Sequence, residues 1–352
     1  MRGECLPARK SENIFARTRS PRTVPPAVPT TSLQQPTTTP QHYTWAGLDF
    51  ILDRNGTPVL LEANKSSHML GEYLEFCGDD RPFQLTADVM NAAEGPPCLL
   101  WRRGEPFPDA DEDACWIGTK LTKYLRETPI VCDVEDNQQP RLELLARDDR
   151  SVRPGSIFRW WYGLPWSYER SGVRVINPNC LWVTVRDKFE CYQTLRTATS
   201  FRVPRCFPID RPDQVRPLVD QHPDLFADGF VIKPRVGWGG QGVQIANPDH
   251  APLPFTGPHL LSERIIPPPR GDGFWDVRVF VMAGVYLGGV RYHSSQPVTN
   301  YWRGGHPGPL DRATRDLLEP AALEAVRLLD AAADAIHRLP APPDSPLTSV
   351  TY

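Results

Sequence analysis

The chain has 352 residues, with 39 Lys or Arg against 42 Asp or Glu, and its formal net charge is -3 at pH 7. A chain of this length can bury the cores of two or three lobes, so an enzyme with a cleft between lobes is compatible with its size. The charge balance lacks the basic excess typical of proteins that bind nucleic acid or anionic membranes. We therefore expect no nucleic-acid partner.

The eight cysteines are scattered, without a C-x-x-C pair or a histidine cluster at the spacing typical of metal ligands. This pattern favours reduced thiols over a disulfide framework or a zinc knuckle. No apolar run approaches the roughly 20 residues that a membrane-spanning helix needs, and the N-terminal residues contain no hydrophobic signal core. We expect a cytoplasmic protein without a membrane partner.

Residues 1–41 contain seven prolines and a Thr-, Gln- and Pro-rich stretch at 29–40, with few apolar side chains. Such a segment cannot offset the entropy that ordering costs, so we predict a disordered tail. An organellar transit peptide is the alternative, because arginines, among them Arg2, Arg9, Arg17 and Arg19, lie here. Glu4, Glu12 and the prolines disfavour the amphipathic helix that a transit peptide would form.

Residues 45–64 predict a β-hairpin, because the runs GLDFILD and TPVLLEAN flank Arg54-Asn55-Gly56, and Asn-Gly is typical of tight turns. The stretch 77–176 predicts a small α/β lobe, because short apolar runs alternate with helical patterns. The strands expected in this stretch are 97–101, 129–135 and 156–161. The helices expected in it are 83–93, 116–125 and 166–171, and a further helix is expected just before it, at 68–76.

A further change of pattern lies at 173–178. The elements expected after it are a helix at 188–197, a strand at 230–234 followed by a glycine-rich loop, a strand at 259–266, a long strand pair at 275–293, a helix at 320–336 and a short strand at 348–352. The helix is expected because apolar residues recur at helical spacing. The sequence thus favours the α+β class.

Three oxygen donors lie on the predicted hairpin. Asp49 is on its first strand, and Glu62 and Asn64 follow thirteen and fifteen residues later on the second. Residues two apart on a strand share a face, so the hairpin can bring all three together. Mg²⁺ prefers such hard oxygen ligands, although ordinary polar residues at strand ends would give the same pattern.

The segment VIKPRVGWGGQGV at 231–243 is rich in glycine. Its glycines allow close backbone approach to phosphate oxygens, and Lys233 supplies a charge. The glycines are Gly237, Gly239, Gly240 and Gly242. No Gly-Lys-Ser/Thr follows, as in a Walker A loop, and the segment does not open the first helix of a dinucleotide fold. A structural hairpin remains the alternative.

The order of these motifs resembles the ATP-grasp superfamily. Asn177, the Asp187-Lys188 helix start, the Lys233 strand, the glycine loop and the Ser262–Ile266 strand follow one another as in the nucleotide-binding half of that fold. The later segments Trp275–Val279, Val290–Tyr292 and Thr299–Gly305 resemble the glutathione synthetase and ribosomal-protein glutamate ligase branches. The resemblance implies ATP and Mg²⁺ as cofactors.

The segment AGLDFILDRNGTPVLLEAN resembles the last motif of that family, yet it lies at the start of this chain. We therefore predict a circularly permuted ATP-grasp fold, a change that folds tolerate when their ends lie close together. The expected divisions are 1–41 (disordered tail), 42–76 (C-terminal part of the ATP-grasp domain), 77–176 (pre-ATP-grasp-like lobe) and 177–352 (nucleotide-binding and central subdomains). Alternatives are a fusion of two modules or a wrongly assigned gene start, in which the hairpin would not face the Lys233 loop.

The resemblance implies roles for individual residues. Lys188, Lys233 and the four glycines would contact the ATP phosphates, and Glu263 and Ile265 would lie at the adenine. Asp49, Glu62 and Asn64 would bind Mg²⁺. Arg278 and Arg291, on successive strands, would hold the transferred phosphoryl group, and Asn300, with Gly304 and Gly305, would lie near the reacting carbonyl.

The implied reaction joins a small-molecule or peptide carboxylate to an amine through an acyl phosphate. The sequence does not identify these substrates, the general base or the oligomeric state. An ATP-grasp kinase acting on a hydroxyl and a non-catalytic ATP-binding module are the alternatives. The intact Asp49, Glu62, Asn64, Lys188 and Lys233 argue against the second.

Overall fold

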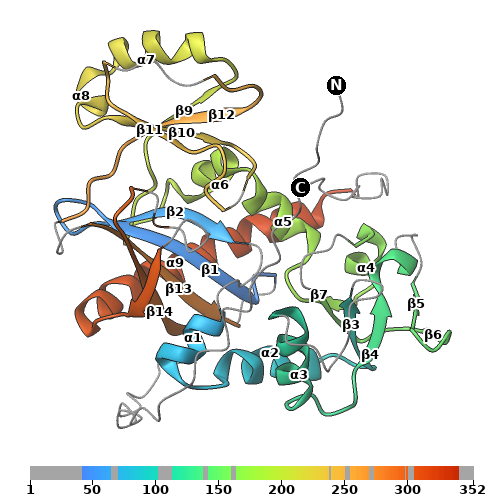
Figure 1. Ribbon diagram of the computed structural model, residues 1–352. Helices are drawn as coiled ribbons and strands as arrows, with labels where there is room; N and C mark the ends of the chain where they lie inside the picture. Colours follow the sequence, from blue (N-terminus) through green and yellow to red (C-terminus); the bar gives the residue numbers. More distant parts are fainter. Residues whose placement is uncertain are drawn as a thin grey trace, which may run out of the picture. The chain divides into compact units, whose positions relative to one another are not determined.

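A computed structural model describes residues 42–64, 70–101, 113–137, 142–159, 164–237, 239–249, 254–268, 273–297, 299 and 305–340. The predicted tail at 1–41 and the predicted strand at 348–352 lie outside these residues. The described chain is a mixed α/β structure with several separate sheets, in agreement with the α+β class (Figure 1).

The largest sheet has five strands in the order β15-β14-β13-β1-β2, and every pair in it is antiparallel. The strands are β1 (Trp45–Leu52), β2 (Pro58–Asn64), β13 (Phe274–Met282), β14 (Val285–Ser294) and β15 (His306–Pro309). Strand β1 lies between β2 and β13, as Figure 1 shows. The hairpin near the start of the chain therefore completes a sheet whose other strands come from near its end.

The predicted β1–β2 hairpin is confirmed, and local hydrogen bonds explain its turn. Asp53 Oδ1 accepts hydrogen bonds from the backbone N–H groups of Asn55 and Thr57, each at 3.0 Å. Gly56 has φ 78°, a left-handed conformation that costs glycine little because it has no Cβ. The Asn-Gly signal in the sequence thus located the turn correctly.

Apolar side chains cover both faces of this sheet. On one face Leu48, Val277 and Val279 pack in a core with Leu329 of the long helix α9 (Arg312–Arg338). On the other face Phe280 belongs to a core with apolar residues of α1 (Leu70–Cys77) and α2 (Arg81–Asn91). The alternation of side chains along each strand separates the two cores.

The second sheet has the order β11-β10-β12-β9 and is antiparallel. Its strands are β9 (Cys206–Ile209), β10 (Phe230–Pro234), β11 (Gln244–Ala246) and β12 (His259–Glu263). Buried residues of α7 (Val215–Gln221) and α8 (Pro223–Phe226) pack against it. These helices follow β9 and the short η2 (Pro212–Gln214). Two further helices precede β9 in the chain, α5 (Asn179–Arg186) and α6 (Lys188–Leu195).

The third sheet is parallel, with the order β4-β3-β7-β8, and it lies within the stretch predicted as a small α/β lobe. Its strands are β3 (Pro97–Trp101), β4 (Ile130–Asp133), β7 (Ser156–Arg159) and β8 (Arg174–Val175). The other elements of this stretch are α3 (Asp113–Thr122), η1 (Val134–Asn137), the pair β5 (Leu144–Leu145) and β6 (Ser151–Val152), and α4 (Trp166–Arg170).

Several element boundaries differ from the prediction by a few residues, and two of these differences have a clear physical reason. Helix α9 begins at Arg312, before the predicted start at Pro320, because Asp311 caps it by accepting a 2.9 Å hydrogen bond from the Thr314 N–H. Strand β12 ends at Glu263 and not at residue 266, because Glu263 pairs with Phe230, the first residue of the neighbouring β10. Beyond that pair the strand has no ladder partner on β10.

The sequence analysis did not predict α5. Asn177, two residues before this helix, holds the start of β1. Asn177 Oδ1 accepts hydrogen bonds from the Thr44 and Trp45 N–H groups at 3.0 and 2.9 Å, and Asn177 Nδ2 donates to the Trp45 carbonyl at 2.7 Å. Asn177 is buried and has φ 50°, a left-handed conformation that Asn tolerates better than most residues. This side chain fixes the entry into β1.

None of the helices in the described ranges has the length and apolar character required to cross a lipid bilayer.

Candidate active site

The three predicted metal-binding residues lie together on one face of the five-stranded sheet. Asp49 is directly opposite Glu62 on β2, and Gly47 is opposite Asn64. Asn64 Nδ2 donates hydrogen bonds to Asp49 Oδ2 at 3.3 Å and to the Gly47 carbonyl at 3.2 Å. The hairpin register therefore brings two carboxylates and an amide together, as their spacing predicted.

Arg278 of β13 lies on the other side of Asp49, which is its register partner. Its Nε and Nη2 donate to the two oxygens of Asp49 at 2.6 and 2.7 Å, a bidentate pair. Burial by itself lowers the pKa of Arg278, but the charge and hydrogen bonds of Asp49 raise it above its usual value. These two bonds leave the Nη1 donors of Arg278 for another acceptor.

Lys188 connects the hairpin to the glycine-rich loop. Its Nζ lies 3.3 Å from Glu62 Oε1 and donates a 2.7 Å hydrogen bond to the Gly237 carbonyl. Lys188 is the first residue of α6, where exposed helical N–H groups add partial positive charge. Asp187 caps this helix by accepting from the Phe189 N–H at 2.9 Å.

Lys233 of β10 is half-buried and lies close enough to Lys188 to feel its charge. Burial, and next the charge of Lys188, lower the pKa of Lys233 to about 8. Its Nζ donates to Tyr192 Oη at 2.6 Å, and Tyr192 Oη donates in turn to the Leu61 carbonyl at 2.5 Å. A lysine with a depressed pKa in such surroundings favours a bound anion, because the anion would supply the missing counter-charge.

The glycine-rich loop connects β10 to β11. Gly239, Gly240 and Gly242 have φ values of 63°, 69° and 70°, a region that side-chain-bearing residues rarely adopt. A Cβ on Gly242 would also lie 2.9 Å from Pro234 Cγ. Arg235, at the start of the loop, pairs with Asp187 at 2.7 Å. The loop is thus tied to the start of α6.

The expected adenine contacts Glu263 and Ile265 lie at and beyond the end of β12. Glu263 is buried, and its Oε1 accepts hydrogen bonds from Arg202 Nη1 at 2.6 Å and from the Arg205 N–H at 2.7 Å. Ile265 is half-buried and follows the last strand residue. Glu263 therefore holds the segment 202–205 to the end of β12.

The expectation that Arg278 and Arg291 act at one site needs correction. Both lie on successive strands of one sheet, as predicted, but Arg278 is opposite Val290 and Arg291 is opposite Val277. Cross-strand partners share a face and neighbours along a strand do not, so the two arginines point to opposite faces. Asn300 and Gly304 lie outside the described residues, and Gly305 is buried.

Two residues that the sequence analysis did not assign to the site lie near its charged groups. Tyr192 bonds Lys233, and it is four residues after Lys188 on α6, a spacing that places both on one helix face and could have revealed it. Asp276 is two residues before Arg278 and accepts a hydrogen bond from Thr299 Oγ1. Burial, with a smaller effect of Asp49, raises the pKa of Asp276 to about 7.

The donor set fits a divalent cation with phosphate oxygens. Asp49, Glu62 and Asn64 supply hard oxygen atoms from adjacent strand positions, the ligand type that Mg²⁺ takes. Asp49 is neutralised by Arg278, and Glu62 lies beside Lys188. With Lys233 added, cations outnumber these carboxylates, so the cluster suits a complex of a metal with a polyanion.

No protein-family model matches the chain, and no curated protein matches it significantly in sequence. A solved structure described as "putative gamma-glutamylcysteine synthetase", from Methylobacillus flagellatus KT, is similar with a TM-score of 0.53 and 11% identity. The match covers 84% of this chain and 89% of that chain. The two proteins share a fold.

A second solved structure, the D-cycloserine synthetase DcsG, matches with 18% identity over 67% of this chain and 82% of that chain. Its TM-score of 0.40 is too low to support an argument. At such identities, the likeness of the first structure concerns the fold and transfers no residue role.

We predict that Arg278→Met lowers the free energy of unfolding by about 3 kcal/mol, because it leaves the largely buried Asp49 carboxylate without its partner. Asp49→Asn should also destabilise the protein, and the double variant should lose clearly less than the sum of the two single losses. Urea unfolding of the four proteins measures this coupling. Additive losses would show that the pair contributes no interaction energy.

The lowered pKa of Lys233 predicts a pH-dependent stability. The unfolded state, with a lysine pKa of 10.5, keeps its proton to higher pH than the folded state, with a pKa of about 8. The free energy of unfolding therefore rises with pH between the folded-state pKa of about 8 and the unfolded-state pKa of 10.5. Relative to Lys233→Met, the wild type should gain about 2 kcal/mol between pH 7 and 10. Lys123→Met, which removes an exposed lysine, is the control, and parallel curves for wild type and Lys233→Met would contradict the prediction.

Proposed function

We propose that the protein is an ATP- and Mg²⁺-dependent carboxylate-amine ligase with a circularly permuted ATP-grasp fold. One contact supports this most directly: Lys188 Nζ lies 3.3 Å from Glu62 Oε1. This contact joins two groups of residues. One is the hairpin, which has the metal-type ligands, and the other is the start of α6 with the glycine loop, which have the phosphate-type ligands. If the hairpin belonged to a separate module, these two groups would have no reason to meet.

The entry into β1 supports the permutation. The backbone N–H groups of His42 and Tyr43 donate to Asp330 Oδ1 of α9 at 2.7 and 2.8 Å. The helix that ends the described chain thus contacts the segment that begins it. In the unpermuted order, α9 would be followed by β1 and β2.

Lys188, Lys233 and the glycine loop are the residues proposed to bind the ATP phosphates. The two lysines offset phosphate charge as compact cations, and glycine N–H groups can approach the oxygens closely. Because Lys233 is half-buried with a pKa of about 8, phosphate would also favour its protonated form. Glu263 and Ile265 remain the proposed adenine neighbours, with the Glu263 carboxylate engaged by Arg202.

Asp49, Glu62 and Asn64 are proposed to hold Mg²⁺, which would neutralise charge on the phosphate oxygens when bound. Arg278 orients Asp49 through two hydrogen bonds and keeps the Nη1 donors for an oxygen of the reacting group. Because Arg291 points to the opposite face, it has no part in this proposal.

The proposed reaction has two steps. A carboxylate oxygen of the substrate attacks the γ-phosphorus of ATP, the bond to ADP breaks, and an acyl phosphate forms. An amine nitrogen then attacks the acyl carbon, and inorganic phosphate leaves as the amide forms. Negative charge develops on oxygen in both steps, so preorganised cations such as Arg278 and Lys188 would stabilise both transition states.

The similar solved structure is described as a synthetase of gamma-glutamylcysteine, a compound in which an amide joins a carboxylate and an amine. This description agrees with the proposed reaction class. It does not transfer the substrate, which we propose only as a small-molecule or peptide carboxylate together with an amine.

The ligase proposal predicts that the protein releases ADP and phosphate from Mg-ATP only when both a carboxylate and an amine substrate are present. A panel of amino acids and short peptides, with coupled detection of ADP and phosphate, measures this. Glu62→Gln should lower the rate by about 100-fold or more, because it removes a charged metal ligand. Glu94→Gln, at an exposed carboxylate, should not change the rate. Turnover that is unaffected by Glu62→Gln would contradict the proposal.

The permutation predicts that a rearranged gene gives a folded protein. Its product would begin at residue 70, run to residue 352 and continue through a short Gly/Ser linker into residues 42–64. It should keep the circular dichroism spectrum and cooperative unfolding of the parent, because β1 can still pair with β13. The same chain without residues 42–64 is the control. If the rearranged chain behaves like this control, the permutation is refuted.

A further inference from the structure

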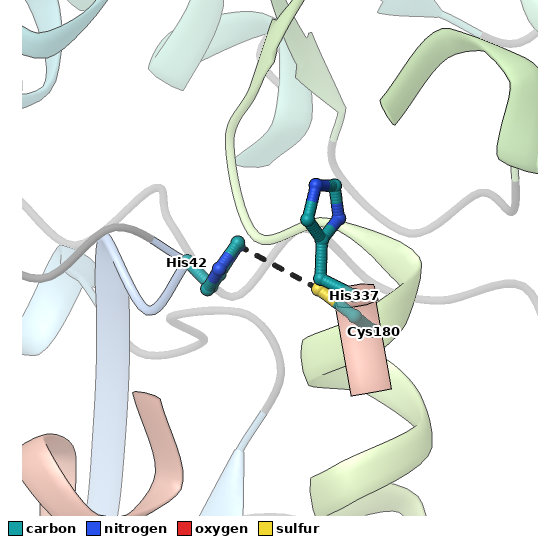
Figure 2. Close-up of side chains that lie close together, drawn as sticks. All are labelled: His42, Cys180 and His337. Carbon is teal, nitrogen blue, oxygen red and sulfur yellow. Dashed lines mark hydrogen bonds between the residues drawn. The ribbon is translucent and has the colours of Figure 1, made fainter. Parts of the chain in front are cut away.

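A histidine, a cysteine and a second histidine meet where the beginning and the end of the described chain lie together (Figure 2). His42 precedes β1, Cys180 is in the first turn of α5, and His337 is in the last turn of α9. One potential ligand atom from each lies within 4.8 Å of the other two. Imidazole nitrogen and thiolate sulfur are the ligand types that Zn²⁺ takes in proteins.

The ring nitrogen His337 Nδ1 of this cluster is buried without a hydrogen-bond partner among the described residues. His42 as a whole is only 8% exposed. A buried polar atom without a partner costs about 1–3 kcal/mol, so it is usually satisfied by a ligand, a water molecule or an ion. This burial distinguishes the cluster from a chance meeting of surface histidines.

The distances suit a tetrahedral cation. Zn–S and Zn–N bonds of about 2.3 and 2.0 Å at a tetrahedral angle place sulfur and nitrogen about 3.5 Å apart. Cys180 Sγ lies 3.6 Å from His42 Nδ1, the contact drawn as a dashed line in Figure 2. A nitrogen of His337 lies within 4.8 Å of the other two ligand atoms, and a change of its side-chain torsions would bring it to the ion.

Neighbouring carboxylates are placed as outer partners of such a site. With His42 Nδ1 facing Cys180, its Nε2 faces Asp334 Oδ1 at 3.5 Å. Metal-bound histidines commonly donate the other ring N–H to a carboxylate, which fixes the tautomer and the ring orientation. Asp330 holds the backbone N–H of His42 at 2.7 Å and so positions this residue.

We propose that His42, Cys180 and His337 bind a Zn²⁺ ion that fastens the segment before β1 to α5 and to the end of α9, with water as the fourth ligand. On binding, the S–H bond of Cys180 breaks, its proton passes to solvent, and the sulfur donates an electron pair to the metal. Without metal, burial raises the pKa of Cys180 to about 12, and the thiol keeps its proton.

This site uses none of the residues proposed for ATP or Mg²⁺, so it stands or falls independently of the ligase proposal. Because it ties the entry of β1 to two helices, its role is the stability of the sheet that contains Asp49. Anything that binds the folded state and not the unfolded state stabilises the fold by mass action. Zinc should therefore raise the melting temperature.

The test uses the full chain, purified without a histidine tag and stripped of metal by a chelator that is then removed. Titration with Zn²⁺ should reach one ion per chain and raise the melting temperature by several degrees. Titration with Co²⁺ should give the near-ultraviolet charge-transfer absorption of a cobalt thiolate. Cys180→Ser should abolish this absorption, and Cys180→Ser and His337→Ala should each weaken zinc binding at least tenfold, a loss of the size seen when even outer partners are removed.

Two controls keep the result interpretable. His306→Ala removes an exposed histidine on β15 and should bind zinc as the wild type does. His337 is half-buried near the end of α9, so its alanine variant should keep the wild-type circular dichroism spectrum even if Cys180→Ser folds poorly. Less than stoichiometric zinc, a melting temperature that zinc does not raise, or binding that survives both site variants would overturn the proposal.

Discussion

The antiparallel pairing of β1 with β13 is the constraint on which the rest of the structure depends. It places Asp49 directly opposite Arg278, although the two residues are 229 positions apart in the chain. The same pairing puts Leu48 and Val279 on the face covered by α9 and leaves the carboxylates on the other face. A shift by one residue would exchange these faces, burying charge and exposing apolar side chains, so the buried face fixes the register.

Around this pair, each charged group of the candidate site has a neighbour that holds it in place. Arg278 holds Asp49, and Lys188 lies beside Glu62. Tyr192 accepts a hydrogen bond from Lys233 and donates one to the Leu61 carbonyl of β2. These contacts join the five-stranded sheet to α6 and β10. A site that is already oriented loses little free energy to reorganisation when charge develops in it, which is the main physical requirement of the proposed chemistry.

The proposed zinc site would also stabilise the position of β1, because it holds the segment that precedes this strand. Asn177 and Asp330 hold the backbone before β1, and His42 in this segment reaches Cys180 and His337. No local sequence pattern indicated this cluster, because Cys180 and His337 lie 138 and 295 residues after His42 and show no local ligand spacing. The absence of a short-range metal motif therefore excluded a zinc knuckle but not a site assembled from distant elements.

The sequence by itself determined the local features: the Asn-Gly turn of the hairpin, the alternation that puts Glu62 and Asn64 on one face, the glycines of the Lys233 loop and the alternating strands and helices within 77–176. These follow from backbone conformation and side-chain periodicity within a few residues. Only the tertiary structure decided that Arg291 faces away from Arg278, that Glu263 is engaged by Arg202, and that Asp276 accepts a hydrogen bond from Thr299. Each of these depends on strand register and packing between segments far apart in the chain, where local propensity contains no information.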